Sequence, residues 1–161
     1  MLLTNSTLML TEKLCYPCYK MFVVFEKRAV SKELFKQKIP VIQDLQARIA
    51  SSKEFIDQNV QSVLCVKDMA DVAHISLYHY TRVFKEIYNT SPYKYFINKK
   101  VQEATSLLVN TELPITTIAY NLGFKDLNSF SRSFRKMHKI SPTDFRTKYL
   151  SKLRTKAIFD Q

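Results

Sequence analysis

Two short segments of the sequence carry arginine, hydroxyl and amide side chains at matching positions. The first is SLYHYTRVFK (76–85) and the second is DLNSFSRSFR (126–135), fifty positions further along the chain. An arginine guanidinium can bind guanine through two hydrogen bonds, an asparagine amide can bind adenine in the same way, and hydroxyl groups pair with either base. Lysine and arginine also bind phosphate oxygens. These residue types therefore indicate contact with a nucleic acid.

The two segments belong to a longer internal repeat. The same register continues into SPYKY (91–95) and SPTDF (141–145), and one inserted residue upstream aligns residues 69–70 with residues 118–119. Each copy predicts a short helix, a tight turn and a longer helix. The matched positions in the longer helix pair Leu77, Tyr80, Thr81, Arg82, Phe84 and Lys85 with Leu127, Phe130, Ser131, Arg132, Phe134 and Arg135.

The longer helix of each copy separates into an apolar face and a polar, basic face. Apolar residues at i, i+4 and i+7 must face a core, and they are Tyr80, Phe84 and Ile87 in the first copy and Phe130, Phe134 and Met137 in the second. A basic face on one isolated helix is usually ordinary solvated surface. Because the pattern is duplicated, it favours two helix-turn-helix units, a motif that offers its second helix to the major groove.

Caps and turns divide each copy in a similar way. Asp68 is expected to cap a helix over 69–74, and Ser76 a second helix that runs to about residue 88. Asp126 occupies the cap position of the second copy. The single glycine, Gly123, falls at the turn, where positive φ is usually required. His74 stands at the equivalent place and predicts a mildly strained or differently built turn.

Composition favours a helical protein that attracts polyanions. Glycine-built hairpin turns are scarce in a chain of 161 residues with one glycine, so an all-α fold is expected. The formal net charge is +11. Three cysteines, an odd number, argue against a disulfide framework and predict a reducing compartment. The first ten residues lack the pattern of a signal peptide and no run reaches the roughly 20 apolar residues of a membrane helix, so we expect a cytoplasmic protein without membrane contact.

The second copy resembles the AraC/XylS family of transcription regulators. The stretch ITTIAYNLGFKDLNSFSRSFRKMHKISPTDFR (115–146) follows the family pattern of an I-x-x-I-A helix, then G-F, an F-S-R-x-F-[KR] helix and S-P-x-x-[FY]-R. The resemblance covers about residues 52–149 and implies a bihelical domain of about seven helices that binds double-stranded DNA. It further implies an activator that positions RNA polymerase at bacterial promoters and needs no cofactor. The first copy is similar through Ala70, Ala73, Ser76, Arg82, Phe84 and Lys85.

Carried over position by position, the resemblance assigns roles to ten residues. Phosphate contacts are expected from Lys85, Arg135 and Lys136. Leu127 cannot donate a hydrogen bond, so it contacts a thymine methyl group or serves the packing of its own helix. The family often has glycine at residues 89 and 139, and a lysine at the latter predicts a distorted last turn. Base contacts are expected from Tyr78, Thr81, Arg82, Leu127, Asn128, Ser131 and Arg132.

The resemblance also suggests how the chain is divided. Residues 1–40 form an amino-terminal arm or extension, residues 41–150 the AraC-type DNA-binding domain, and residues 151–161 a basic tail. Within the domain, the first helix-turn-helix covers about 52–91, a connecting helix 92–110, and the second helix-turn-helix about 114–150. Fifty residues cannot build the usual sensor domain, so the chain resembles short family members that lack one. We expect a monomer or weak homodimer associated with the nucleoid.

Two helices outside the repeat copies show apolar stripes. The connecting helix over 92–110 places Phe96, Lys100 and Ala104 at helical spacing. A second stripe runs from about residue 41 to residue 60 and either docks on its own domain or pairs two chains. Pro40 is expected to begin or break that helix. The second stripe contains Ile42, Leu45, Ile49, Ile56 and Val60.

The amino-terminal residues leave several alternatives open. Residues 21–25 form a short strand or a buried apolar segment, and Met21 is an alternative start. Cys15 and Cys18 make a C-x-x-C, which alone is a weak signal for zinc because a tetrahedral site needs two more ligands. Ada-type DNA alkyl-transfer proteins need four such cysteines in a longer domain. No catalytic constellation is evident, so we expect no enzyme and no metal. A module that binds a protein partner without reading DNA is a further alternative.

Overall fold

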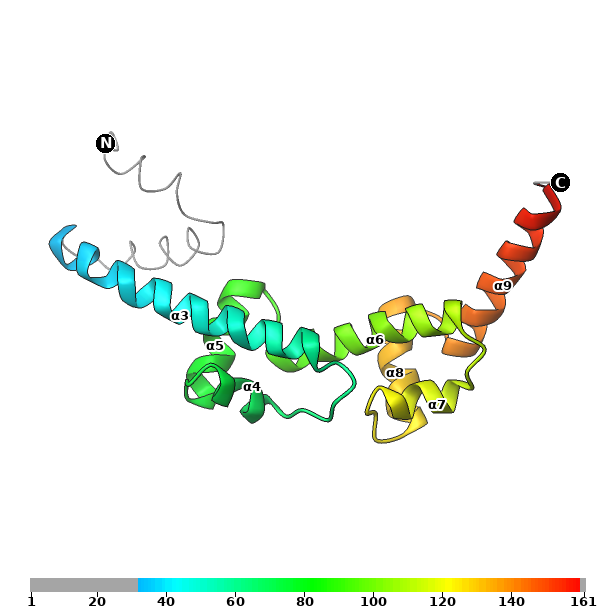
Figure 1. Ribbon diagram of the computed structural model, residues 1–161, viewed down its shortest axis with the longest axis horizontal. Helices are drawn as coiled ribbons and strands as arrows, with labels where there is room; N and C mark the ends of the chain where they lie inside the picture. The colour runs from blue at the N-terminus through cyan, green and yellow to red at the C-terminus, as the bar shows by residue number, and fades with distance from the viewer. Residues whose placement is uncertain (1–31, 160–161) are drawn as a thin grey trace. The chain divides into compact units, whose positions relative to one another are not determined.

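The computed structural model describes the backbone of residues 32–159 and the side chains of residues 40–149 and 151. Cys15, Cys18 and the segment 21–25 therefore lie outside the described residues. Within these limits every regular element of the chain is a helix, which confirms the all-α prediction (Figure 1). The helices are α3 (Lys32–Gln58), α4 (Val66–Val72), α5 (Leu77–Tyr88), α6 (Pro92–Asn110), α7 (Ile115–Asn121), α8 (Leu127–His138) and α9 (Pro142–Phe159).

The helices form two units, each of which contains one predicted helix-turn-helix. Unit one comprises the described residues up to 53 together with 66–92, and unit two comprises residues 54–65 together with the residues from 93 onward. α4 and α5 are the helix pair of unit one, and α7 and α8 are the pair of unit two. Each unit therefore has its own core and is described by itself.

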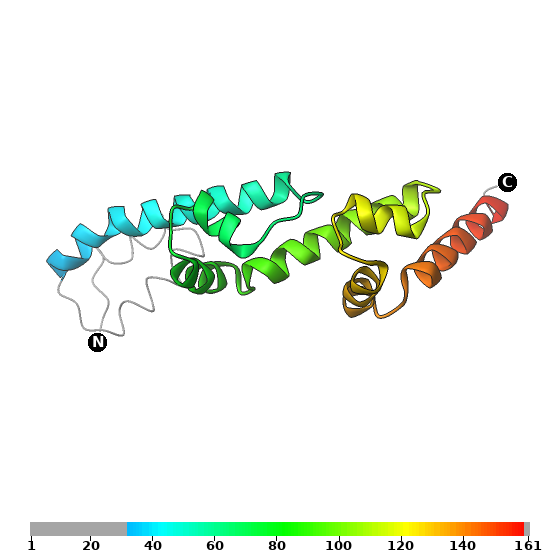
Figure 2. The same cartoon turned by 90° about the horizontal axis from the view of Figure 1, so that it is seen from below.

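A buried serine joins the three helices of unit one, which lie side by side in Figures 1 and 2. The hydroxyl of Ser52 in α3 donates a 2.6 Å hydrogen bond to the carbonyl of Met69 in α4. Because Ser52 has a single proton to give, the phenol of Tyr80 in α5 donates to its oxygen, at 2.8 Å. Burial raises the pKa of Tyr80 to about 12. This bond network stays neutral and fixes α5 against α3.

The apolar face of α5 forms the core of unit one, as its spacing predicts. Tyr80 and Phe84 are fully buried, with ring centroids 5.6 Å apart, and Ile87 is half-buried. Ile49 of α3 is also fully buried. The α3 stripe therefore docks on its own domain at this point, and the docking alternative is the one that the structure supports there.

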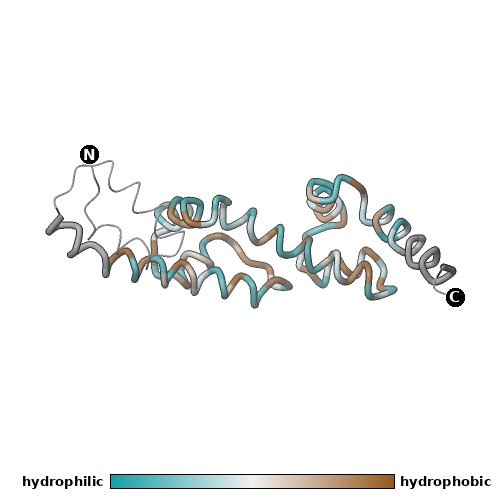
Figure 3. Tube along the Cα trace, turned by 90° about the horizontal axis from the view of Figure 1, so that it is seen from above, coloured by the Kyte–Doolittle hydropathy of each residue, from teal (hydrophilic) through white to brown (hydrophobic). Residues whose placement is uncertain are grey.

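An aromatic cluster fills the core of unit two. Phe130 and Phe134 of α8 are fully buried; Phe124 meets Phe130 edge to face at 5.2 Å, and Phe145 of α9 meets Phe134 in the same way at 5.4 Å. The ring of His138 stacks on Phe134 at 4.5 Å. Apolar and hydrophilic residues alternate along these helices in Figure 3. The cluster binds α9 to α8 and leaves the opposite face of α8 to solvent.

Unit two also contains a buried lysine. Lys100 of α6 is 2% exposed, and its ammonium donates to the carbonyl of Ser62 at 2.9 Å and to that of Gly123 at 3.4 Å. The same nitrogen lies 4.4 Å from the centroid of the Phe96 ring. Desolvation lowers the pKa of Lys100 to about 8. Lys100 thus holds the loop after α3 to the turn before α8.

Two predicted helix boundaries are wrong. α3 begins at Lys32 and runs through Pro40, because a proline removes one amide donor and costs stability but its fixed φ is compatible with a helix. α4 begins at Val66, so Asp68 lies in its first turn instead of capping it. A carboxylate in the first turn is still favoured by the helix dipole, which explains why the residue resembles a cap in the sequence.

Candidate DNA-binding surface

The turns before α5 and α8 share one backbone geometry. His74 has a φ of 52° and Gly123 a φ of 65°, both left-handed. The next amide in each turn donates to a carbonyl five residues back, Ile75 to Ala70 at 3.2 Å and Phe124 to residue 119 at 3.1 Å. The turn at His74 is therefore not built differently. Its histidine adopts a conformation that costs a non-glycine residue about 1–2 kcal/mol.

The ends of α5 and α8 also match, although neither has glycine. Asn89 has a φ of 54° and Lys139 a φ of 65°. The amide of Lys139 donates to the carbonyl of Arg135 at 2.8 Å and closes the last turn of α8. The predicted distortion of this turn is thus wrong. Lys139 therefore adopts the left-handed conformation after α8, as Asn89 does after α5.

The two helices differ in how they are capped. The carboxylate of Asp126 accepts hydrogen bonds from the backbone amide of Ser129 at 2.6 Å and from its hydroxyl at 2.9 Å. The hydrogen bond from the backbone amide of Ser129 is the main reason that the pKa of Asp126 lies below its usual value. Ser76 occupies the cap position of α5 but makes no side-chain capping bond. Its φ of −58°, against −156° for Asp126, aims the side chain differently.

The predicted contact residues of unit one lie together on the exposed side of α5. Tyr78 is 80% exposed, and Arg82 and Lys85 are exposed as well. Thr81 donates its hydroxyl proton to the carbonyl of Leu77 at 2.9 Å. Its oxygen is therefore left as an acceptor, suited to a base amino group.

The predicted contact residues of unit two occupy the corresponding side of α8. Ser131 is half-buried. Leu127 packs against the unit-two core, so the structure favours packing among its two predicted roles. Its repeat equivalent, Leu77, is 50% exposed. The exposed members of the set are Asn128, Arg132, Arg135 and Lys136.

One acidic residue on the exposed side of α5 was missed in the sequence analysis. Glu86 is exposed, and its Oε1 lies 3.9 Å from Nε of Arg82. At the offset of fifty residues it corresponds to Lys136 in α8. The alignment of the two repeat copies could have revealed Glu86, because it pairs this anion with the cation Lys136.

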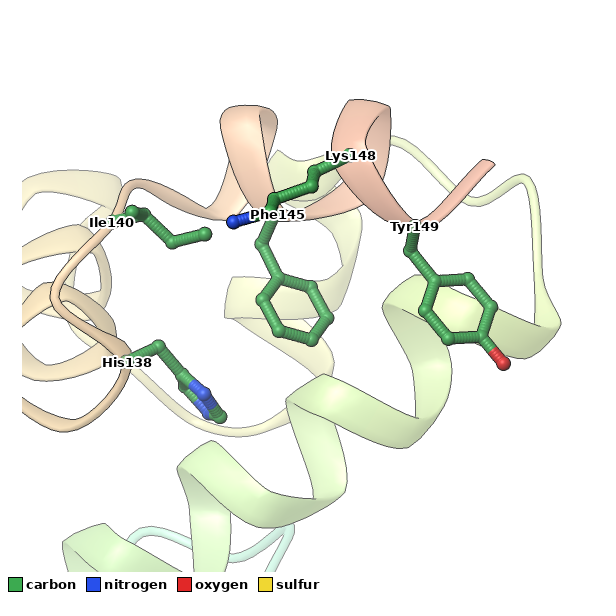
Figure 4. Close-up of a pocket in the computed structure, with 5 residues that line it drawn as sticks. All are labelled: His138, Ile140, Phe145, Lys148 and Tyr149. Atoms are coloured by element: carbon green, nitrogen blue, oxygen red, sulfur yellow. The ribbon is translucent and has the colours of Figure 1, made fainter. Parts of the chain in front are cut away.

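A small hollow in unit two lies between the end of α8 and α9 (Figure 4). It has a volume of about 230 Å³ and is lined by His138, Ile140, Phe145, Lys148 and Tyr149. That is below the roughly 300–1,000 Å³ of typical ligand sites. Nε2 of His138 lies 2.9 Å from the hydroxyl of Thr105. The aromatic floor of the hollow belongs to the packing of α9 on α8.

The described part of the chain offers little support for metal binding or membrane insertion. Among its side chains, no group of three or more histidine, cysteine, aspartate or glutamate residues is placed to hold a metal ion. Cys65, the described cysteine, is exposed. In the same residues, every helix is too short or too polar to cross a lipid bilayer.

Comparison with known proteins agrees with this geometry. Residues 69–148 match the family described as "Helix-turn-helix domain". The lactose operon transcription activator of Staphylococcus xylosus is 30% identical over 116 residues, which are 69% of this chain and 42% of that protein. The bifunctional transcriptional activator/DNA repair enzyme AdaA of Bacillus subtilis is 32% identical over 93 residues, 58% of this chain and 44% of its own. The chain thus spans less than half the length of these curated relatives.

Solved structures share the fold. The DNA-binding domain of AdpA, a global transcriptional factor crystallised with a target DNA, superposes with a TM-score of 0.63 at 21% identity, covering 65% of this chain and 94% of that one. A transcriptional regulator with an AraC-type DNA-binding domain from Chromobacterium violaceum gives a TM-score of 0.59 at 26% identity, covering 65% and 93%. With its tandem helix-turn-helix units and these relatives, the chain carries over residues 69–148 the helix-turn-helix domain of AraC-type transcription regulators.

Proposed function

We propose that this protein binds double-stranded DNA sequence-specifically and regulates transcription at bacterial promoters as an activator. The observation that carries the proposal is the repeated exposed face of α5 and α8, on which an arginine and a hydroxyl recur at matched positions. Each face lies on the second helix of a helix-turn-helix, the element that enters the major groove in this motif. The S. xylosus relative is named as an activator.

The exposed residues divide by chemistry into readers of bases and binders of phosphate. Tyr78, Thr81 and Arg82 read bases from α5, and Asn128, Ser131 and Arg132 read them from α8. Arginine is matched to guanine and asparagine to adenine. Lys85, Arg135 and Lys136 bind phosphates, which sets the register without selecting sequence. Leu127 positions α8 through its packing, with thymine contact as its lesser role.

The partners and location follow from the same proposal. The chain acts on DNA in the cytoplasm, associated with the nucleoid, and contacts RNA polymerase at the promoter. One chain holds two reading helices, so it works as a monomer or weak homodimer. No step of this function requires an enzyme activity, a cofactor or a metal.

The decisive experiment is a titration of the full chain against promoter fragments of its own genome and random duplexes of equal length at physiological salt. Specific affinities typically exceed non-specific ones by about 10³-fold or more. Equal affinity for both sets of DNA contradicts the proposal. Transcription in vitro with RNA polymerase then separates activation from repression.

Two variants test the assigned roles within α8. Arg132→Ala is expected to relax the preference at one base pair, because a good bidentate contact is worth about 1–3 kcal/mol of discrimination. Lys136→Ala is expected to weaken binding to all sequences evenly and to flatten its salt dependence. If a protein partner is bound instead, that binding persists in the double variant Arg82→Ala/Arg132→Ala while DNA binding is absent in both proteins.

A further inference from the structure

The exposed faces of α5 and α8 carry different charge. Within α5 the charged residues are the cations Arg82 and Lys85 and the anion Glu86. Within α8 the cations are Arg132, Arg135 and Lys136, and the nearby anion is the cap residue Asp126, whose carboxylate accepts two hydrogen bonds from Ser129. Phosphate contacts supply most of the sequence-independent affinity for DNA. The two units therefore differ in their sequence-independent affinity for DNA.

Glu86 lowers the sequence-independent affinity of unit one for DNA in two ways. Its carboxylate lies on the same exposed side of α5 as Arg82, and an anion there repels phosphate. Its Oε1 also lies 3.9 Å from Nε of Arg82, one helical turn away. Both side chains are largely exposed, so the ion pair is weak. It still competes with a phosphate or a guanine for the guanidinium.

The first turn of α5 exposes two uncharged side chains. Tyr78 is 80% exposed and Leu77 is 50% exposed. In α8 the corresponding residues are Asn128, which is exposed and polar, and Leu127, which packs into the core of its unit. Leu77 can contact the methyl group of thymine, and the phenol of Tyr78 can donate a hydrogen bond, but neither side chain is a cation. The first turn of α5 therefore adds no charged phosphate contact to unit one.

We infer that the two units bind DNA with unequal strength: unit two supplies the larger part of the sequence-independent affinity through phosphates, and Glu86 lowers the part that unit one supplies. The inference rests on the proposed function, because it assumes that both exposed faces meet DNA. It assigns Glu86 the role of lowering the affinity of α5 for DNA of any sequence.

The test uses the full chain and a random 30-base-pair duplex, titrated by fluorescence anisotropy between 50 and 200 mM salt. Glu86→Lys copies the charge pattern of α8, in which Arg132 and Lys136 already stand four residues apart, so the fold has a precedent for it. One added phosphate contact steepens the salt slope by about 0.9, which changes the ratio of affinities over this range by about 3.5-fold. Glu103→Lys, at an exposed position of α6, is the control with the same change of net charge.

A second pair of variants measures the inequality directly. Lys85 and Arg135 are equivalent, exposed positions of the two units. Arg135→Ala is expected to weaken binding to the random duplex more than Lys85→Ala does, because Glu86 already weakens the phosphate contacts of α5. Circular dichroism verifies that each variant is folded.

The outcomes separate the inference from the function on which it rests. If the wild-type chain binds no duplex even at 50 mM salt, both are overturned. If it binds but Glu86→Lys matches Glu103→Lys, or Lys85→Ala costs as much as Arg135→Ala, the inference is overturned and the function stands. A steeper salt slope in Glu86→Lys with the larger loss in Arg135→Ala supports it.

Discussion

Replacing Gly123 by alanine tests the physical reason for the single glycine of the chain. Gly123 has a φ of 65°, and a β-carbon there would lie 3.0 Å from the carbonyl oxygen of Gln61, 3.1 Å from Nζ of Lys100 and 3.3 Å from the carbonyl oxygen of Ser62. The two carbonyls belong to backbone and cannot turn aside. An added methyl group therefore meets both a strained dihedral angle and a crowded space.

The expected cost combines three effects. Left-handed backbone costs alanine about 1–2 kcal/mol, and crowding in a packed site adds about 1–3 kcal/mol. The loss of glycine's freedom in the unfolded chain returns about 0.4–1 kcal/mol. We expect Gly123→Ala to lower the free energy of unfolding by about 3 kcal/mol, which corresponds to a decrease in melting temperature of roughly 6–12 °C for a chain of this length.

Urea unfolding followed by circular dichroism measures this loss, and His74→Ala is the matched control. His74 occupies the equivalent turn, is exposed and already has a positive φ of 52°. Alanine there leaves the strain as it is, so the change should stay within about 0.5 kcal/mol. The reasoning is refuted if Gly123→Ala shifts the urea midpoint no further than His74→Ala.

Three further changes test the contacts of the two units. The pKa of Lys100 is lowered to about 8, so the folded state binds fewer protons above that pH than the unfolded state, and stability should rise by about 2 kcal/mol from pH 8 to 10. Lys100→Met should abolish the rise in pH-dependent urea unfolding; a rise of wild-type size in the variant would contradict this. Asp126→Ala should lower the melting temperature more than Ser76→Ala, because the side chain of Asp126 makes the capping bond; equal losses would contradict it. Ser52→Ala should cost about 1–3 kcal/mol in calorimetry, since it leaves the buried Tyr80 hydroxyl without its partner, whereas Tyr80→Phe should cost less, and the reverse order would refute the network.

The second helix of each copy could be predicted from the sequence because its signals are local. Tyr80 and Phe84, like Phe130 and Phe134, lie four residues apart, and a core contact at that spacing requires a helix. The exposed residues then follow from geometry on the opposite face. For this reason the ten predicted contact residues all fall on α5 and α8.

Helix starts were harder to predict, since neighbouring residues give competing signals. Asp68 has the chemistry of a cap, yet α4 starts two residues before it and uses the carboxylate in its first turn. Pro40 usually ends a helix, but α3 continues through it. In both cases a local preference of about 1–3 kcal/mol does not decide where the helix begins.

The role of Lys100 depends on contacts that the sequence does not reveal. Its helical spacing within 92–110 placed Lys100 on the apolar stripe of α6, where a charged side chain is unusual. Its two hydrogen-bond acceptors are backbone carbonyls at residues 62 and 123, 38 and 23 positions away. A backbone carbonyl has no sequence signature, so no pattern could have identified either partner.

The same contacts explain why the two turns hold different residues at one backbone geometry. Positive φ alone does not demand glycine here, because His74, Asn89 and Lys139 all adopt it. What distinguishes Gly123 is the buried ammonium of Lys100 and the carbonyls of residues 61 and 62 on the side where a β-carbon would point. The turn at His74 is exposed, so its side chain extends into solvent and only the dihedral strain is left. Gly123 is therefore required by packing within unit two as well as by the turn, and the backbone carbonyls of residues 61 and 62 would crowd a β-carbon even without Lys100.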